Sequence, residues 1–182
     1  MNGATLIGGQ DPDAGGGASG VFHVGGNVIA TQPLGVVIHE ATIDGNFVEI
    51  GGGGGMTCNP SGIFAVFQSP VFSVLEGTHL GGQMTVVGLQ SCWFGITHNV
   101  IDGGVRVLRN QLADPDAIEI LDNTIGGNLV CRRNSMMWDS ADIEEESLYP
   151  RLWEPNRVSG QRVGQCVVAP PLTEGGTSPG AF

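Results

Sequence analysis

A short glycine pattern recurs along this chain and constrains its fold more than any other feature. The pattern is an aliphatic residue, a small or acidic residue, glycine and usually an amide, as in Ile125-Gly126-Gly127-Asn128. Its third position, the anchor, falls at Gly26, Gly45, Gly62, Gly82, Gly103, Gly127 and Gly160, at spacings of 19, 17, 20, 21, 24 and 33 residues. The copy at Gly62 is degenerate. A repeat of about twenty residues indicates a solenoid.

Aliphatic residues keep fixed positions around the anchor. They stand two before it at Val24, Ile43, Leu80, Ile101, Ile125 and Val158; two after it at Val28, Phe47, Phe64, Met84, Val105 and Leu129; and four after it at Val66, Val86, Val107 and Cys131. A period of two across a glycine predicts bent strands. A helical stack is excluded, because no window shows helical spacing and 31 glycines would each cost about 1 kcal/mol in a helix.

Polar residues follow the same register. Asn99, Asn123 and Asn156 stand four before their anchors, in line with Ala41 and Thr78. In a parallel solenoid, equivalent positions lie about 4.8 Å apart, so stacked amides form a ladder of hydrogen bonds. A second amide row follows the anchor at Asn27, Asn46, Gln83, Asn128 and Gln161. The sequence therefore predicts an all-β parallel solenoid, a β-helix of about six to seven coils.

The chain divides into five segments. We expect an N-terminal capping segment over 1–20, β-helix coils over 21–134, an acidic insertion over 135–155, a last coil over 156–168 and an extended C-terminal tail over 169–182. Within the coils, the glycine run Gly51–Gly55 predicts a flexible loop. The apolar stretches after it, Ile63–Phe67 and Val71–Leu75, are predicted to be strands.

Charge and cysteine content bear on partners and location. The chain has a net charge of -11 and no basic residue before Arg106, which argues against nucleic acid as a partner. Cys131 and Cys166 fall on successive coils, so we expect them to pair, which leaves Cys58 for Cys92. Two disulfides indicate an oxidising compartment, secreted or at the cell surface, although four reduced thiols in a cytosolic protein remain an alternative. No apolar run reaches membrane-spanning length, and since the start resembles no signal peptide, we expect that one has been removed.

The segments Asn123–Cys131 and Asn156–Cys166 resemble the final coils of secreted actinobacterial proteins of the right-handed parallel β-helix type. In that family a Gly-Asn-Leu-x-Cys coil is followed by a Gly-Gln-Cys coil, and both cysteines are present here. The resemblance covers roughly residues 70–170. It implies a right-handed coil and an extracytoplasmic location, and it implies no particular activity.

Pectate-lyase-like enzymes share this kind of coil and use clustered carboxylates with a basic residue. Here Asp44 and Asp102 share one repeat position, but counting three coils between them places them about 14 Å apart, too far for a glycosidase pair. The densest alternative is Asp122 with the arginines, which either bind a ligand or form structural ion pairs. The candidate binding residues are Arg106, Arg109, Asp122, Arg132 and Arg133.

The interpretation that we favour is a secreted, non-catalytic β-solenoid, a structural or binding module that self-assembles through its coil ends or by exchange of its tail. The alternative is a polysaccharide-binding or polysaccharide-degrading protein of the pectate-lyase type, using the arginine-rich flank. The partners are accordingly copies of the chain itself or a cell-surface glycan. We expect no metal site and no cofactor, with calcium left open and no residue set to support it. Scattered histidines such as His79 and His98 are interpreted as turn residues.

Overall fold

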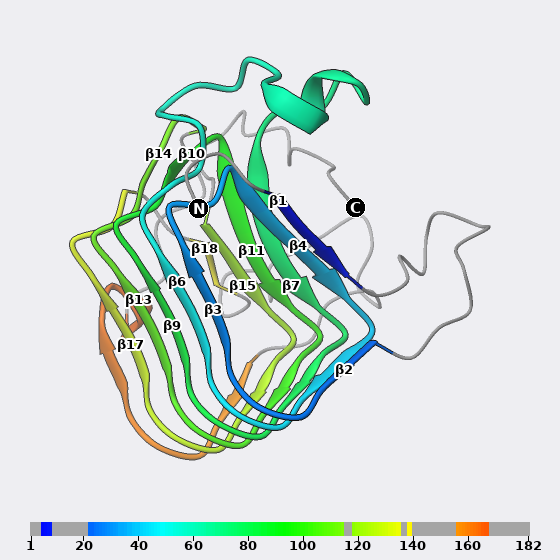
Figure 1. Ribbon diagram of the computed structural model, residues 1–182. Coiled ribbons are helices and arrows are strands. Elements are labelled where there is room, and N and C mark those ends of the chain that lie inside the picture. The colour runs from blue at the N-terminus through cyan, green and yellow to red at the C-terminus, as the bar shows by residue number, and fades with distance from the viewer. Residues whose placement is uncertain (1–4, 9–21, 115–117, 136–137, 140–155, 168–182) are drawn as a thin grey trace, which may run out of the picture.

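The protein is all-β, with stacked parallel sheets (Figure 1). The computed structural model describes residues 5–8, 22–114, 118–135, 138–139 and 156–167. Every strand pair within these ranges is parallel. This arrangement fits the β-solenoid that the repeat predicts.

Three sheets have six strands each. Sheet A consists of β1 (Thr5–Gly8), β4 (Gly35–His39), β7 (Phe72–Glu76), β11 (Trp93–Thr97), β15 (Ile118–Leu121) and β18 (Trp138–Asp139). Sheet B consists of β2 (Phe22–Val24), β5 (Ala41–Ile43), β8 (His79–Leu80), β12 (Val100–Ile101), β16 (Thr124–Ile125) and β19 (Arg157–Val158). Sheet C consists of β3 (Val28–Thr31), β6 (Phe47–Ile50), β9 (Met84–Val87), β13 (Val105–Leu108), β17 (Leu129–Arg132) and β20 (Arg162–Gly164). The short sheet D pairs β10 (Gln90–Ser91) with β14 (Gln111–Leu112).

The chain passes through sheets B, C and A in turn, and we call one such passage a winding. Strands β5, β6 and β7 form one winding, and β8, β9 and β11 form the next. Each winding adds one strand to each sheet, so equivalent residues of successive windings lie side by side. The interior is filled by the predicted aliphatic rows, for example Ile43, Leu80 and Ile101 of sheet B, which are at most 1% exposed.

Two corners of the winding repeat the same local structure. Between sheets A and B, a residue with positive φ precedes the ladder position, as at His98 (φ 55°) before Asn99 and Asp122 (φ 53°) before Asn123. After sheet C the same occurs at Arg109 (φ 57°). Non-glycine residues seldom adopt this left-handed conformation. The bend therefore needs support, which the buried amide after each such residue provides through its hydrogen bonds.

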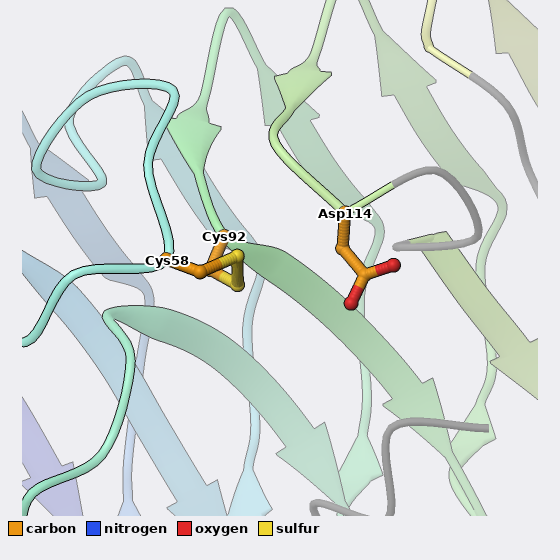
Figure 2. A group of neighbouring side chains, drawn as sticks. All are labelled: Cys58, Cys92 and Asp114. Atoms are coloured by element: carbon orange, nitrogen blue, oxygen red, sulfur yellow. A yellow bond between two sulfur atoms is a disulfide. The ribbon is translucent and has the colours of Figure 1, made fainter. Parts of the chain in front are cut away.

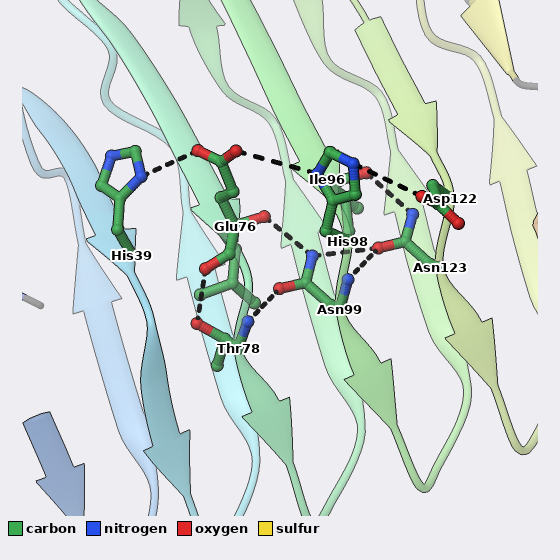
Figure 3. A network of polar contacts seen from close by, with 9 residues as sticks. His39, Glu76, Thr78, Ile96, His98, Asn99, Asp122 and Asn123 are labelled. Carbon is green, nitrogen blue, oxygen red and sulfur yellow. Dashed lines mark hydrogen bonds and ion pairs between the residues drawn. The ribbon is translucent and has the colours of Figure 1, made fainter. Parts of the chain in front are cut away.

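The predicted asparagine ladder is present at the corner between sheets A and B, one residue before each strand of sheet B (Figure 3). The Asn123 side chain accepts hydrogen bonds from the backbone N–H and the amide of Asn99, both at 3.0 Å, and donates to Asn156 Oδ1 at 2.9 Å. All three amides are at most 5% exposed. The second predicted row also forms hydrogen bonds, from Asn46 to Asn27 and from Gln161 to Asn128, but it is exposed.

The prediction of a winding at Gly62 is wrong. Strand β6 pairs directly with β9, so no strand lies between them, and Gly62 begins the short 3-10 helix η1 (Gly62–Ala65). The stretch 63–67 is therefore not a strand, and Val66 is 72% exposed. Residues 56–70 form a loop that leaves the stack at one corner (Figure 1). The loop forms here because Pro60 replaces the aliphatic residue of the pattern, and proline favours turns and cannot donate to a strand ladder.

The glycine run is part of the stack, which corrects the expectation of a flexible loop. All five glycines have positive φ, and their backbone bonds to both neighbouring windings: Gly53 N donates to Pro33 O at 2.9 Å, and Gly55 N donates to Gln90 O at 3.0 Å. A Cβ at Gly52 or Gly53 would clash with the backbone of Pro33 or Gln90, respectively. Glycine is needed here for close approach of the backbones as well as for its conformation.

The predicted segments are described in part. Within the capping segment, β1 pairs in parallel with β4 and extends sheet A. The predicted insertion over 135–155 begins with β18, which pairs with β15, so sheet A continues into it. Its residues 140–155 and the tail over 169–182 lie outside the described residues. The last winding holds β19, β20 and the 3-10 helix η3 (Gln165–Val167).

Candidate functional site

A line of titratable side chains runs across four windings along the corner between sheets A and B (Figure 3). His39 ends β4, and Glu76 is its register partner at the end of β7. His98 and Asp122 are the first residues after β11 and β15, at the positive-φ position of the corner. The local fold therefore places the four side chains in a row in space, in which imidazoles alternate with carboxylates.

Glu76 is the centre of this line. Its Oε2 lies 2.8 Å from His39 Nδ1, a hydrogen-bonding distance, and its Oε1 lies 3.8 Å from His98 Nδ1, in ion-pair range. The other ring nitrogen of His98, Nε2, lies 3.4 Å from Asp122 Oδ2. The hydrogen bond from His39 and then the contact with His98 lower the pKa of Glu76 to about 2, against the opposing effect of burial. Glu76 therefore stays ionised at neutral pH.

This line fits charge compensation better than proton transfer. A carboxylate that remains ionised at neutral pH does not serve as a general acid there. The Glu76 side chain is 10% exposed and the His39 side chain 13%, so both are largely covered. Thr97, the register partner of Glu76 on β11, is fully buried, and its Oγ1 has no hydrogen-bond partner among the described residues. The repeat does not predict His39 and Glu76 as site residues, because both lie on sheet A, outside the window around the anchor glycine.

The predicted arginine group is only partly brought together. Arg106 and Arg109 lie on β13 and at its corner, and Arg132 and Arg133 take neighbouring places on β17 and at its corner. All four are exposed, and none forms an ion pair within the part of the chain that the structure describes. The predicted fifth member, Asp122, lies instead at the corner between sheets A and B with His98. Asp122 stands five residues before its anchor glycine, whereas the four arginines stand after theirs. This difference in position separates Asp122 from the arginines.

The two aspartates of the repeat, Asp44 and Asp102, are each paired with a histidine on the outer face of sheet B. His23 Nε2 lies 3.0 Å from Asp44, and His79 Nε2 lies 3.3 Å from Asp102. Because Gly62 adds no winding, β5 and β12 are separated only by β8, which puts the aspartate backbones about 9.6 Å apart rather than 14 Å. Both pairs are about half exposed, which favours weak surface ion pairs.

The four cysteines form two disulfides, Cys58–Cys92 and Cys131–Cys166, the pairing that the register favours. The first bridge ties the 56–70 loop to Cys92, the residue before β11. Asp114 lies beside it, with a carboxylate oxygen within 4.8 Å of both sulfur atoms (Figure 2). Because both sulfurs are bonded to each other, this group offers a metal ion only the carboxylate.

A third amide ladder was not predicted. Asn110 and Asn134 follow sheet C at the second corner, each after a positive-φ arginine. Asn110 Oδ1 accepts from Leu89 N at 2.9 Å, Asn134 Oδ1 accepts from Asn110 N at 3.0 Å, and Gln165 Oε1 accepts from Asn134 N at 2.8 Å. The signal was in the sequence, since Asn110 and Asn134 each stand seven after an anchor.

No protein-family model, no curated protein and no solved structure matches this chain. The described residues include no helix that is long and apolar enough to cross a membrane.

Proposed function

We propose that this protein is a secreted, non-catalytic, right-handed parallel β-helix of six windings, which serves as a structural module and stacks end to end with copies of itself. The two disulfides support secretion. The resemblance of the last coils to secreted actinobacterial β-helix proteins supports the handedness and the location. The largely covered, charge-compensated line around Glu76 supports a structural role.

The observation that carries end-to-end stacking is the incomplete cover of the interior at the first winding. Val24, Val28 and Ala30 point into the interior but are only partly buried. Their neighbours in the next winding, Ile43 and Phe47, are at most 1% exposed. Among the described strands, β2 and β3 also pair on one side only. An open strand edge over apolar surface is a template for another chain.

Stacking is tested by introducing a charged side chain at the first winding. Ala30→Lys places an ammonium group at the partly covered interior, where an inward-pointing charge blocks edge pairing. Thr42→Lys, on the outer face of sheet B, is the matched control. Light scattering and negative-stain imaging at about 100 µM are expected to show elongated oligomers for the wild type and the control and shorter species for Ala30→Lys. A wild type without elongated oligomers would refute stacking.

The second candidate is binding of an acidic polysaccharide at the arginine-rich flank. The observation in its favour is that four exposed guanidinium groups lie on neighbouring windings without ion pairs among the described residues, on a chain of net charge -11. Titration calorimetry with a polyuronate is expected to show binding that Arg109→Gln with Arg133→Gln removes. Arg157→Gln, on sheet B, is the control.

Catalysis is tested on the same polysaccharides. The proposal expects neither unsaturated products nor new reducing ends, with or without calcium. Release of either product would refute the non-catalytic assignment while leaving the stacking experiment valid.

A further inference from the structure

The outer face of sheet C has an unusual composition. Its strands lie side by side along the left of Figure 1. Alternate residues point outward and form two rows across the windings, Ile29–Val48–Thr85–Arg106–Val130–Val163 and Thr31–Ile50–Val87–Leu108–Arg132. Apart from two threonines and two arginines, every outward residue is aliphatic. The face has no acidic side chain, although the chain carries 18 acids.

Solvent reaches this face. Ile29 is 66% exposed and Ile50 is 42% exposed, while Val87 and Leu108 are half-buried. Strands with one solvated face normally alternate apolar and polar residues, and these strands do not. A contiguous aliphatic face that lacks carboxylates on an otherwise acidic molecule is typical of an interface.

We propose that two copies of this chain pack together through the outer faces of their C sheets, with the two-fold axis parallel to the strands. A second copy presents the same spacing of about 4.8 Å between strands, so the two sets of rows can interdigitate as in two packed sheets. The face includes no aromatic ring to stack on a sugar, which disfavours a glycan here. This surface is separate from the winding ends, so it goes beyond the stacking proposed above.

The positions of the arginines select the axis. Arg106 and Arg132 lie on the neighbouring strands β13 and β17, toward one end of the face. An axis along the stacking direction keeps each strand opposite its own copy but exchanges the two rows, so it would bring Arg106 of one copy about one strand spacing, 4.8 Å, from Arg132 of the other, which like-charge repulsion opposes. An axis along the strands reverses the order of the strands. With β9 on the axis, Val87 then faces Val87, and each Arg132 faces Thr31 of the other copy.

The area sets the expected strength. With β9 on the axis, five strands of each copy overlap. At about 4.8 Å per strand and four residues of about 3.3 Å, they give each copy a face of about 320 Å², or about 400 Å² once the corner side chains are included. Two copies would then bury about 800 Å², which is below the range of stable complexes, so we expect a weak, concentration-dependent dimer with a dissociation constant in the upper micromolar range.

Cysteine cross-linking tests both the contact and the axis. Val87→Cys is expected to form a disulfide with its own copy under mild oxidation, and a mixture of Ile50→Cys with Leu108→Cys is expected to cross-link one to the other. Arg132→Cys alone is not expected to do so, because its two copies lie about four strand spacings apart, roughly 19 Å. Efficient self-linking of Arg132→Cys, or none by Val87→Cys, would overturn the proposal.

Analytical ultracentrifugation gives the second measurement. Val87→Lys is expected to raise the dimer dissociation constant at least about tenfold, while Thr42→Lys, on sheet B, leaves it unchanged. Ala30→Lys shortens stacks without removing the dimer, so the two proposals fail separately. A wild type that stays monomeric and instead floats with vesicles of phosphatidylcholine and phosphatidylserine would overturn the dimer in favour of a lipid surface.

Discussion

A buried carboxyl group gives the sharpest test of the packing. Glu49 lies on the inward face of β6, in one row with Ala30 and Val86, and is 0% exposed. Its Oε1 accepts a hydrogen bond of 2.8 Å from Ser73 Oγ, whereas Oε2 has no hydrogen-bond partner among the described residues. Burial raises the pKa of Glu49 to about 8, against the smaller opposing effect of Ser73. The folded protein therefore holds this proton at neutral pH.

The sign of the effect on stability follows from proton binding. Between pH 4.5, the ordinary pKa of a glutamate side chain, and the folded pKa of about 8, folded Glu49 is protonated and unfolded Glu49 is not. The free energy of unfolding then falls by about 1.4 kcal/mol per pH unit as the pH rises. The full loss, about 5 kcal/mol above pH 8, is an upper value, because water penetration and relaxation reduce it.

Glu49→Gln should abolish this slope. The amide oxygen can still accept from Ser73, but the amide N–H₂ leaves two donors without a partner where the protonated carboxyl leaves one, which costs about 1–3 kcal/mol. The variant is therefore expected to be less stable than wild type near pH 5 and more stable near pH 9. Urea unfolding followed by circular dichroism at about pH 5, 7 and 9 measures the difference, with the exposed Glu40→Gln as control. If the free energies of unfolding of wild type and variant differ by the same amount at all three pH values, the buried, protonated state is refuted.

Three further outcomes follow from the polar contacts. Asn123→Ala is expected to cost about 3–5 kcal/mol in urea unfolding, because it leaves buried ladder groups unpaired, whereas the exposed Asn128→Ala costs less than about 1 kcal/mol; equal costs would contradict the ladder. Because its pKa is lowered, Glu76 stabilises the fold above pH 4.5 and loses that effect as the pH falls toward 2, so Glu76→Gln should be about 2 kcal/mol less stable than wild type at neutral pH and equal to it near pH 2. Asp114→Asn should speed reduction of the Cys58 disulfide by glutathione about threefold at low salt, since the carboxylate repels the attacking thiolate; an unchanged rate, measured by thiol labelling, would remove that role.

The interior of the fold could be predicted because stacking makes it periodic. A residue such as Ile43 or Leu80 meets the same neighbours in every winding, so one position in the repeat defines a whole row. The Asn99 ladder was predictable for the same reason. Gly62 was not distinguishable by spacing, because the 37 residues between Gly45 and Gly82 equal two ordinary repeats. The separation of Asp44 from Asp102 was consequently overestimated.

The candidate site was harder to predict, because outward side chains carry no periodic constraint. His39 and Glu76 meet only because their strands are neighbours, and the inserted loop separates them by 37 residues. Grouping Asp122 with the arginines failed for a related reason. Two residues on neighbouring windings can lie on different sides of the β-helix. The side is determined by how many residues each one stands before or after its anchor glycine.

The outward residues of the three sheets explain why sheet C, rather than sheet A or sheet B, is free to pack against another copy. On sheet A, outward residues such as Val74 and Glu119 are at most 4% exposed, so that face is already covered. On sheet B, the outward positions carry His23 and His79, whose exposed ion pairs with aspartates would lose solvation in a contact. Among the described strands, sheet C is the one that carries whole rows of aliphatic side chains with solvent access, whereas the outward face of sheet B has Val100 beside polar residues. Burying it costs no carboxylate desolvation, so the hydrophobic gain of about 25 cal/mol per Å² is opposed by the entropy of association and by partial desolvation of Arg106 and Arg132.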